Sequence, residues 1–114
     1  MKVLLINGSP HEKGCTYTAL SLIAKELNDA GVDTEILHVG GKPVGGCIGC
    51  GGCASGSGCV FGGVVNEAIE KAKTADGFVF GSPVHYASAT GNMTSFMDRL
   101  AYAGGRYLAY KPAA

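Results

Sequence analysis

Four cysteines lie within one short stretch of the chain. Cys47, Cys50 and Cys53 follow one another with two residues between neighbours, and Cys59 comes after five more. Thiolates bind zinc and iron–sulfur clusters, and they also act as redox groups. The compact spacing lets three thiolates face one cluster while the fourth reaches round, whereas structural zinc usually takes two separated cysteine pairs. On spacing alone, an iron–sulfur cluster, free redox thiols and zinc all remain open.

The same stretch is unusually rich in glycine. Residues 40–63 hold 11 of the 19 glycines in the chain, together with four of its five cysteines. Glycine loses much backbone entropy on folding, so we expect something else to order this loop, such as a bound metal or cluster or a partner subunit. A mobile loop is the alternative interpretation. The first six residues are typical of a short strand and not of a signal peptide, so we expect a cytoplasmic location. That location favours metal, cluster or redox thiols over disulfides.

Two other loops begin with Gly-Ser-Pro, at positions 8–10 and 81–83. The first loop offers the hydroxyls of Ser9, Thr16 and Thr18 beside a predicted helix N-terminus, which attracts anions. It is neither a Walker A loop nor a G-x-G-x-x-G loop, so a single phosphate suits it best. An ordinary polar turn that caps the helix is the alternative interpretation.

Alternating strands and helices must position these loops. Short apolar runs predict strands over 2–7, 33–39 and 77–82. Helical spacing of apolar residues predicts helices over 16–30, around 65–72, and from Met93 to Leu100, with Gly104-Gly105 ending the last. Such alternation indicates an α/β fold with a parallel sheet, whose functional loops gather at the carboxyl ends of the strands.

The motifs and their order resemble those of the flavodoxin-like NAD(P)H-dependent FMN reductases. The cysteines resemble those of the iron–sulfur flavoprotein branch of that family. The matching stretches run through most of the chain: Ile6-Asn7-Gly8-Ser9-Pro10, Gly14-Cys15-Thr16, the four cysteines, Gly81-Ser82-Pro83-Val84-His85-Tyr86, Thr90-Gly91-Asn92-Met93 and Phe96-Met97-Asp98-Arg99.

The resemblance implies non-covalently bound FMN, with the flavin carrying the electron chemistry and no catalytic side chain required. It assigns the FMN phosphate to the first loop, at Ser9, His11, Cys15, Thr16 and Thr18. It assigns the flavin ring to the second loop, at Pro83, Val84, His85 and Tyr86. It also implies a [4Fe-4S] cluster on Cys47, Cys50, Cys53 and Cys59.

Three positions depart from the family pattern. His11 replaces an arginine of the phosphate loop, so the positive charge is present only when the imidazole is protonated. Cys15 replaces an asparagine, which is a better hydrogen-bonding group. Gly62-Gly63 stand where the family often has two acidic residues before the next helix.

By resemblance, the chain is expected to transfer electrons from NAD(P)H through FMN to a small-molecule or protein acceptor, or to its own cluster. Two alternatives are an electron-transfer module without reductase activity and a non-catalytic remnant that has lost the cofactor. The charges balance, with nine basic and nine acidic residues, so binding to nucleic acid through phosphate neutralisation is not expected. No apolar run is long enough to cross a membrane.

A flavodoxin-like fold has a doubly wound parallel sheet of five strands in the order 2-1-3-4-5. Only the first three strands are assignable here, in the order 2-1-3, so residues 1–114 are expected to form a single, incomplete domain. The tail 107–114 resembles the approach to strand four. The third strand would then be an open edge, from which we expect a homo-oligomer that completes the sheet.

Overall fold

A computed structural model describes all 114 residues. Its main sheet has three parallel strands in the order β2-β1-β3, which confirms the predicted topology. In this sheet Leu5 of the central strand pairs with Ile36 on one side and Val79 on the other. The elements are β1 (Lys2–Asn7), α1 (Cys15–Asp29), β2 (Asp33–His38), the 3-10 helix η1 (Gly52–Ser55), α2 (Val64–Thr74), β3 (Gly77–Gly81), β4 (Val84–His85), β5 (Ser88–Ala89) and α3 (Gly91–Leu108).

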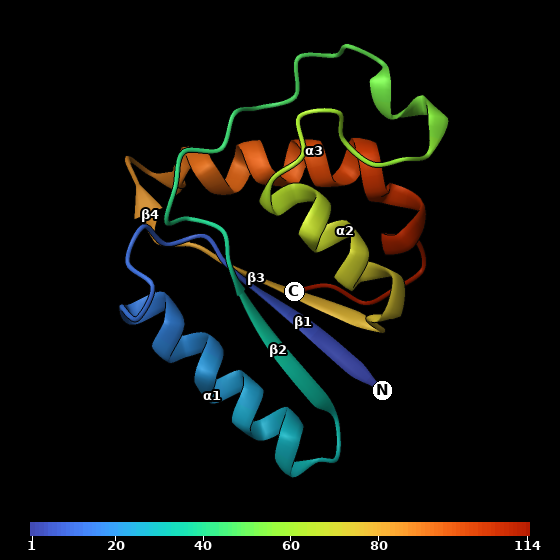
Figure 1. The fold of residues 1–114 in the computed structure, drawn as a ribbon. Helices are drawn as coiled ribbons and strands as arrows, with labels where there is room; N and C mark the ends of the chain where they lie inside the picture. Colours follow the sequence, from blue (N-terminus) through green and yellow to red (C-terminus); the bar gives the residue numbers. More distant parts are fainter.

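Helices cover both faces of the sheet. Figure 1 shows α1 on one face and α2 with α3 on the other, while the segment between β2 and α2 runs along α3. The larger core lies between the sheet and the α2–α3 pair, and Phe96 at its centre is fully buried. The smaller core joins Leu5 of β1 to Leu20 and Ala24 of α1. Alternate side chains of the buried strand β1 therefore supply the two cores.

The predicted end of the last helix at Gly104-Gly105 is wrong, because α3 continues to Leu108. Gly104 is buried where α3 crosses α2. A Cβ atom added at Gly104 would lie 2.8 Å from Cγ1 of Ile69, which is closer than real Cβ atoms approach. The glycine thus permits close helix packing rather than ending the helix.

The chain after α3 returns to the outer edge of β3. The Phe78 N–H donates to the Pro112 carbonyl (3.0 Å), the Ala114 N–H donates to the Phe78 carbonyl (3.1 Å), and the Phe80 N–H donates to the Ala114 carbonyl (2.8 Å). A parallel bridge joins Phe78 and Ala113. The expectation of a bare β3 edge is therefore wrong over 78–80, while association of chains stays a prediction.

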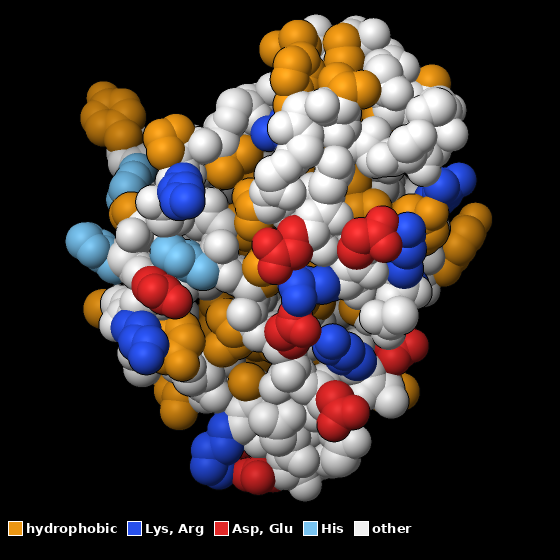
Figure 2. Space-filling view, viewed as in Figure 1, with side chains coloured by type: hydrophobic (Ala, Val, Ile, Leu, Met, Phe, Trp, Pro, Cys, Tyr) orange, Lys and Arg blue, Asp and Glu red, His pale blue; other side chains and the backbone are white.

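Opposite charges are intermingled on the side of the molecule formed by α2 and β2 (Figure 2). There Glu35 accepts from Lys71 (2.6 Å) and Lys2 (3.2 Å). The hydrogen bond from Lys71 outweighs partial burial and, with Lys2, holds the pKa of Glu35 below its usual value. The same bond raises the pKa of Lys71. No helix is both long and apolar enough to cross a membrane.

Candidate functional site

The two Gly-Ser-Pro loops meet at the carboxyl end of the sheet. The Gly8 N–H donates to the Gly81 carbonyl at 2.8 Å, which extends the pairing of β1 with β3 by one bond. The buried Thr90 hydroxyl then donates to the Gly8 carbonyl at 3.1 Å. Figure 1 shows the β4–β5 hairpin beside the turn that precedes α1. The predicted convergence of the two loops on one rim is confirmed.

Thr90 also organises the second loop. Its hydroxyl accepts from the Met93 N–H (3.2 Å) and caps α3, so one side chain joins the helix to the first loop. The Thr90 N–H donates to the Ser82 hydroxyl (3.0 Å), which closes the loop on itself. The position of the second loop is therefore fixed by side chains that sequence reasoning gave no role.

A small cavity of about 130 Å³ opens where the loops meet. It is lined by Gly8, Pro10, Gly40, His85, Thr90, Gly91 and Asn92. None of these side chains is a carboxylate that would repel an anion. Of the predicted flavin-ring residues, His85 alone lines this cavity.

The residues predicted to bind phosphate surround the N-terminus of α1. Ser9 is buried, and its hydroxyl accepts from the His11 N–H (3.1 Å), which shapes the turn. His11 and Cys15 are exposed, and Thr16 is half-buried. The Thr18 hydroxyl donates to the Gly14 carbonyl (3.2 Å), so its proton is already used within the helix.

The first turn of α1 has no side-chain cap, because glycine stands at the N-cap position. Its free N–H groups point toward the space in front of the helix, as those of any uncapped helix do. Together with Cys15 and Thr16, this end of α1 presents donors that suit a phosphate. The geometry of the first loop therefore fits its predicted role.

The second loop contains a hairpin that the sequence did not predict. β4 and β5 are joined by Tyr86 and Ala87, both in the left-handed region with φ of 46° and 67°. Such angles suit a tight hairpin turn but are uncommon for residues other than glycine, so the turn is strained. Val84, His85 and Tyr86 are exposed and Pro83 is half-buried, which leaves these side chains accessible to a ligand.

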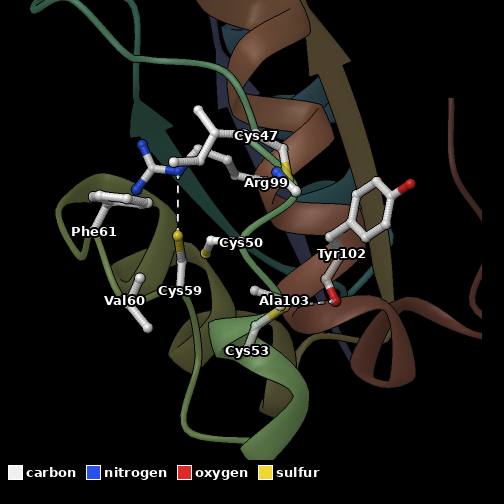
Figure 3. Close-up of a pocket in the computed structure, with 12 residues that line it drawn as sticks. Cys47, Cys50, Cys53, Cys59, Val60, Phe61, Arg99, Tyr102 and Ala103 are labelled. Atoms are coloured by element: carbon white, nitrogen blue, oxygen red, sulfur yellow. Dashed lines mark hydrogen bonds between the residues drawn. The ribbon is translucent and has the colours of Figure 1, made fainter.

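A second cavity, of about 150 Å³, lies beside α3 and is lined by all four clustered cysteines (Figure 3). The wall is largely apolar, with Ile48, Val60, Phe61 and Tyr102 beside the thiols. Cys47 and Cys50 are exposed, whereas Cys53 and Cys59 are partly buried. The Cys53 thiol donates to the Tyr102 carbonyl at 3.8 Å.

Cys59 differs from the other three clustered thiols because its sulfur accepts a hydrogen bond from Arg99. Burial on its own raises the pKa of Cys59, but the hydrogen bond and charge of Arg99 and the N–H groups of Phe61 and Gly62 more than offset this. The pKa of Cys59 therefore lies below its usual value, which favours the thiolate that a metal requires.

The four thiols that line this cavity are the donor type that both zinc and iron–sulfur clusters take. No three His, Cys, Asp or Glu side chains of the chain are gathered closely enough to hold one metal ion. A tetrahedral zinc site needs its sulfurs about 2.3 Å from one centre. A four-iron cluster takes four thiolates around a larger body, so its ligands stand further apart. Four thiols that line one cavity are compatible with that arrangement.

Sequence reasoning missed the polar residues of α3 that order the glycine-rich loop. Asn92 Nδ2 donates to the carbonyls of Gly40 (3.3 Å) and Lys42 (3.0 Å). Arg99 and Arg106 also donate to loop carbonyls. The signal in the sequence is a seven-residue spacing of these three polar residues, which places them on one helix face. The chain itself thus supplies ordering that was expected from a cluster or a partner.

Parallel strands in the order 2-1-3, helices on both faces and two Gly-Ser-Pro loops that meet at one rim are the features of a flavodoxin-like fold. The chain belongs to the family described as NADPH-dependent FMN reductase, which matches residues 1–114. The resemblance drawn from the motifs is thereby confirmed. Relatives named iron–sulfur flavoproteins support the placement of the chain in the iron–sulfur flavoprotein branch of this family.

An iron–sulfur flavoprotein of Methanocaldococcus jannaschii is 33% identical over 99 residues, which are 87% of this chain and 51% of the relative. An iron–sulfur flavoprotein of Archaeoglobus fulgidus is 33% identical over 106 residues, which are 93% of this chain and 48% of the relative. The chain therefore spans about half the length of the curated relatives it matches.

Two solved structures share the fold. The NAD(P)H:quinone oxidoreductase from Methanothermobacter marburgensis superposes with a TM-score of 0.68 at 18% identity, over 90% of this chain and 55% of that one. An FMN-dependent NADH-azoreductase from Bacillus anthracis, in complex with FMN, gives 0.56 at 15% identity, over 88% of this chain and 55% of that one. At these identities the likeness shows the fold alone.

Proposed function

We propose that the protein is an FMN-dependent oxidoreductase that takes electrons from NAD(P)H and passes them to a small acceptor or to an iron–sulfur cluster. The observation that carries this proposal is the direct joining of the two loops. Gly8 bonds to Gly81 at 2.8 Å and to Thr90 at 3.1 Å, so a phosphate group and an aromatic ring of one ligand can reach both loops. Membership of the NADPH-dependent FMN reductase family supports the choice of ligand.

In this proposal Ser9, His11, Cys15, Thr16 and Thr18 surround the FMN phosphate at the start of α1. Ser9 shapes the turn, and the uncapped first turn of α1 supplies N–H donors.

Pro83, Val84, His85 and Tyr86 would contact the ring from the second loop. Bound FMN would supply hydride and single-electron transfer, while the chain binds and orients it. Exposure of Val84, His85 and Tyr86 leaves their surfaces available, and the Ser82–Thr90 hydrogen bond holds the loop that carries them. An aromatic ring such as that of Tyr86 can cover a flat ligand by stacking.

Cys47, Cys50, Cys53 and Cys59 would hold a [4Fe-4S] cluster at the second cavity. Support comes from the sulfur donors that share this cavity and from relatives named iron–sulfur flavoproteins. Anaerobic purification should give flavin absorption bands, a broad shoulder near ~400 nm and about four irons per chain. Iron content near zero after anaerobic reconstitution would refute the cluster.

Cys59→Ser and Cys15→Ser form a matched pair for the cluster test. Cys59 lines the cysteine cavity, whereas Cys15 lies at the start of α1, so only the first replacement should lower the iron content. Oxidation of NADH and NADPH, followed with added FMN, tests the reductase activity separately. Retained FMN without NAD(P)H oxidation would select an electron-transfer module instead, and failure to bind FMN would indicate a non-catalytic remnant.

A further inference from the structure

Arg99 stands at the centre of the contacts between α3 and the glycine-rich loop. Its Nη1 donates to the Gly45 carbonyl at 3.3 Å, and its Nη2 donates to the Gly62 carbonyl at 2.9 Å. Gly45 precedes the first clustered cysteine and Gly62 follows the last one. One planar guanidinium group therefore joins the two ends of the segment that carries all four thiols.

The third donor of Arg99 points at sulfur. Its Nε donates to Sγ of Cys59 at 3.4 Å, as the dashed line in Figure 3 shows. Arg99 is only 9% exposed, and it forms no ion pair with a carboxylate. A buried cation without an anionic partner is costly. Among its acceptors, Cys59 alone can carry a negative charge.

Asn66 holds the main chain of Cys59. The Cys59 N–H donates to Oδ1 of Asn66, and Nδ2 of Asn66 donates back to the Cys59 carbonyl, each at 2.8 Å. Asn66 and Arg99 thus hold the same turn together, Asn66 through the Cys59 backbone and Arg99 through the Cys59 sulfur and the Gly62 carbonyl. Cys47 and Cys50, by contrast, are exposed on glycine-rich backbone.

We propose that Arg99 is the positioning residue of the cysteine site, which holds the Cys59 sulfur at a ligand position and places a fixed positive charge beside it. The effect on a cluster rests on the proposed function, but the effect on the loop does not. A positive charge that donates a hydrogen bond to a ligand sulfur stabilises the more negative, reduced cluster. Arg99 should therefore raise the reduction potential of a cluster bound here.

Three variants separate positioning from charge. Arg99→Gln removes the charge and the paired N–H donors of the guanidinium group. Arg99→Lys keeps the charge, but its ammonium group cannot reach the Gly45 and Gly62 carbonyls together. Arg106→Gln is the matched control, because the exposed Arg106 also donates from α3 to the loop, at the Gly56 carbonyl, but bonds to no sulfur. Far-UV circular dichroism verifies that each variant folds.

The first readout uses cluster-free protein and measures amide hydrogen exchange at Cys59 and Gly62, whose N–H groups bond to Asn66 and to the Cys59 carbonyl. We expect at least tenfold faster exchange in both Arg99 variants and unchanged exchange in the control. The second readout is the cluster potential of the loaded protein. Arg99→Gln should make reduction at least tenfold less favourable, about 59 mV for one electron, while Arg99→Lys stays closer to the wild type.

Unchanged exchange at Cys59 and Gly62 in both Arg99 variants would overturn the positioning role. Equal cluster potentials in the wild type and Arg99→Gln would overturn the charge role. If the wild type binds no iron, the proposed cluster and the charge role fail together. Faster exchange in the Arg99 variants would then still support positioning of Cys59, because that measurement needs no cluster.

Discussion

Replacement of Thr90 by alanine should destabilise the protein by about 2–4 kcal/mol. The hydroxyl caps α3 by accepting from the Met93 N–H, and loss of such a cap costs about 1 kcal/mol. The same hydroxyl donates to the buried Gly8 carbonyl, which alanine leaves without this partner, at a cost of about 1–3 kcal/mol. For a chain of this length, the loss lowers the melting temperature by about 8–16 °C.

Urea denaturation followed by far-UV circular dichroism measures this change directly. Thr90→Ser is the control, because serine keeps the hydroxyl and should lose less than about 1 kcal/mol with the buried methyl group. The m-value should stay constant, since the variant changes no large surface. If Thr90→Ala unfolds within about 0.5 kcal/mol of the wild type, the hydroxyl does not join the two loops and the described rim is incorrect.

Two further predictions concern packing and charge. Gly104→Ala should lower the free energy of unfolding by about 1–3 kcal/mol, because the added methyl group overpacks against Ile69. Gly105→Ala should be neutral or stabilising, because nothing lies within 4 Å of the added Cβ. Thermal unfolding of the two variants checks this, and equal melting temperatures would contradict it. Glu35→Gln should remove less than about 1 kcal/mol at neutral pH, because the ion pair with Lys71 is partly exposed. Since the folded-state pKa of Glu35 is lowered, its contribution is present above the ordinary carboxylate pKa and is lost as pH falls through the folded value, so stability of the variant should depend less on pH in that acidic range.

The sheet and its strand order could be predicted from the sequence, because the strands are short, continuous apolar runs. Short apolar runs at Val3 to Ile6 and at Phe78 to Phe80 are typical of buried strands. The amphipathic helices between them favour parallel pairing of these strands. Convergence of the two Gly-Ser-Pro loops followed from that topology, and the Gly8–Gly81 hydrogen bond confirms it.

The remaining features depend on contacts between distant residues. Gly104 looked like a helix end because glycine commonly ends helices, but its contact with Ile69 in α2 keeps α3 continuous. The β4–β5 hairpin was missed because its turn residues, Tyr86 and Ala87, are not typical turn formers. Arg99 was missed because its acceptors lie 37 to 54 positions away in the chain.

The flavin site is tested most directly by titration of the protein with FMN and with riboflavin, which lacks the phosphate, while flavin fluorescence is recorded. If the first loop binds the phosphate and the second contacts the ring, FMN fluorescence is quenched to saturation at one FMN per chain, and riboflavin binds at least tenfold more weakly, about 1.4 kcal/mol. Equal affinity for both flavins, or no quenching by either, would contradict a site shared by these two loops.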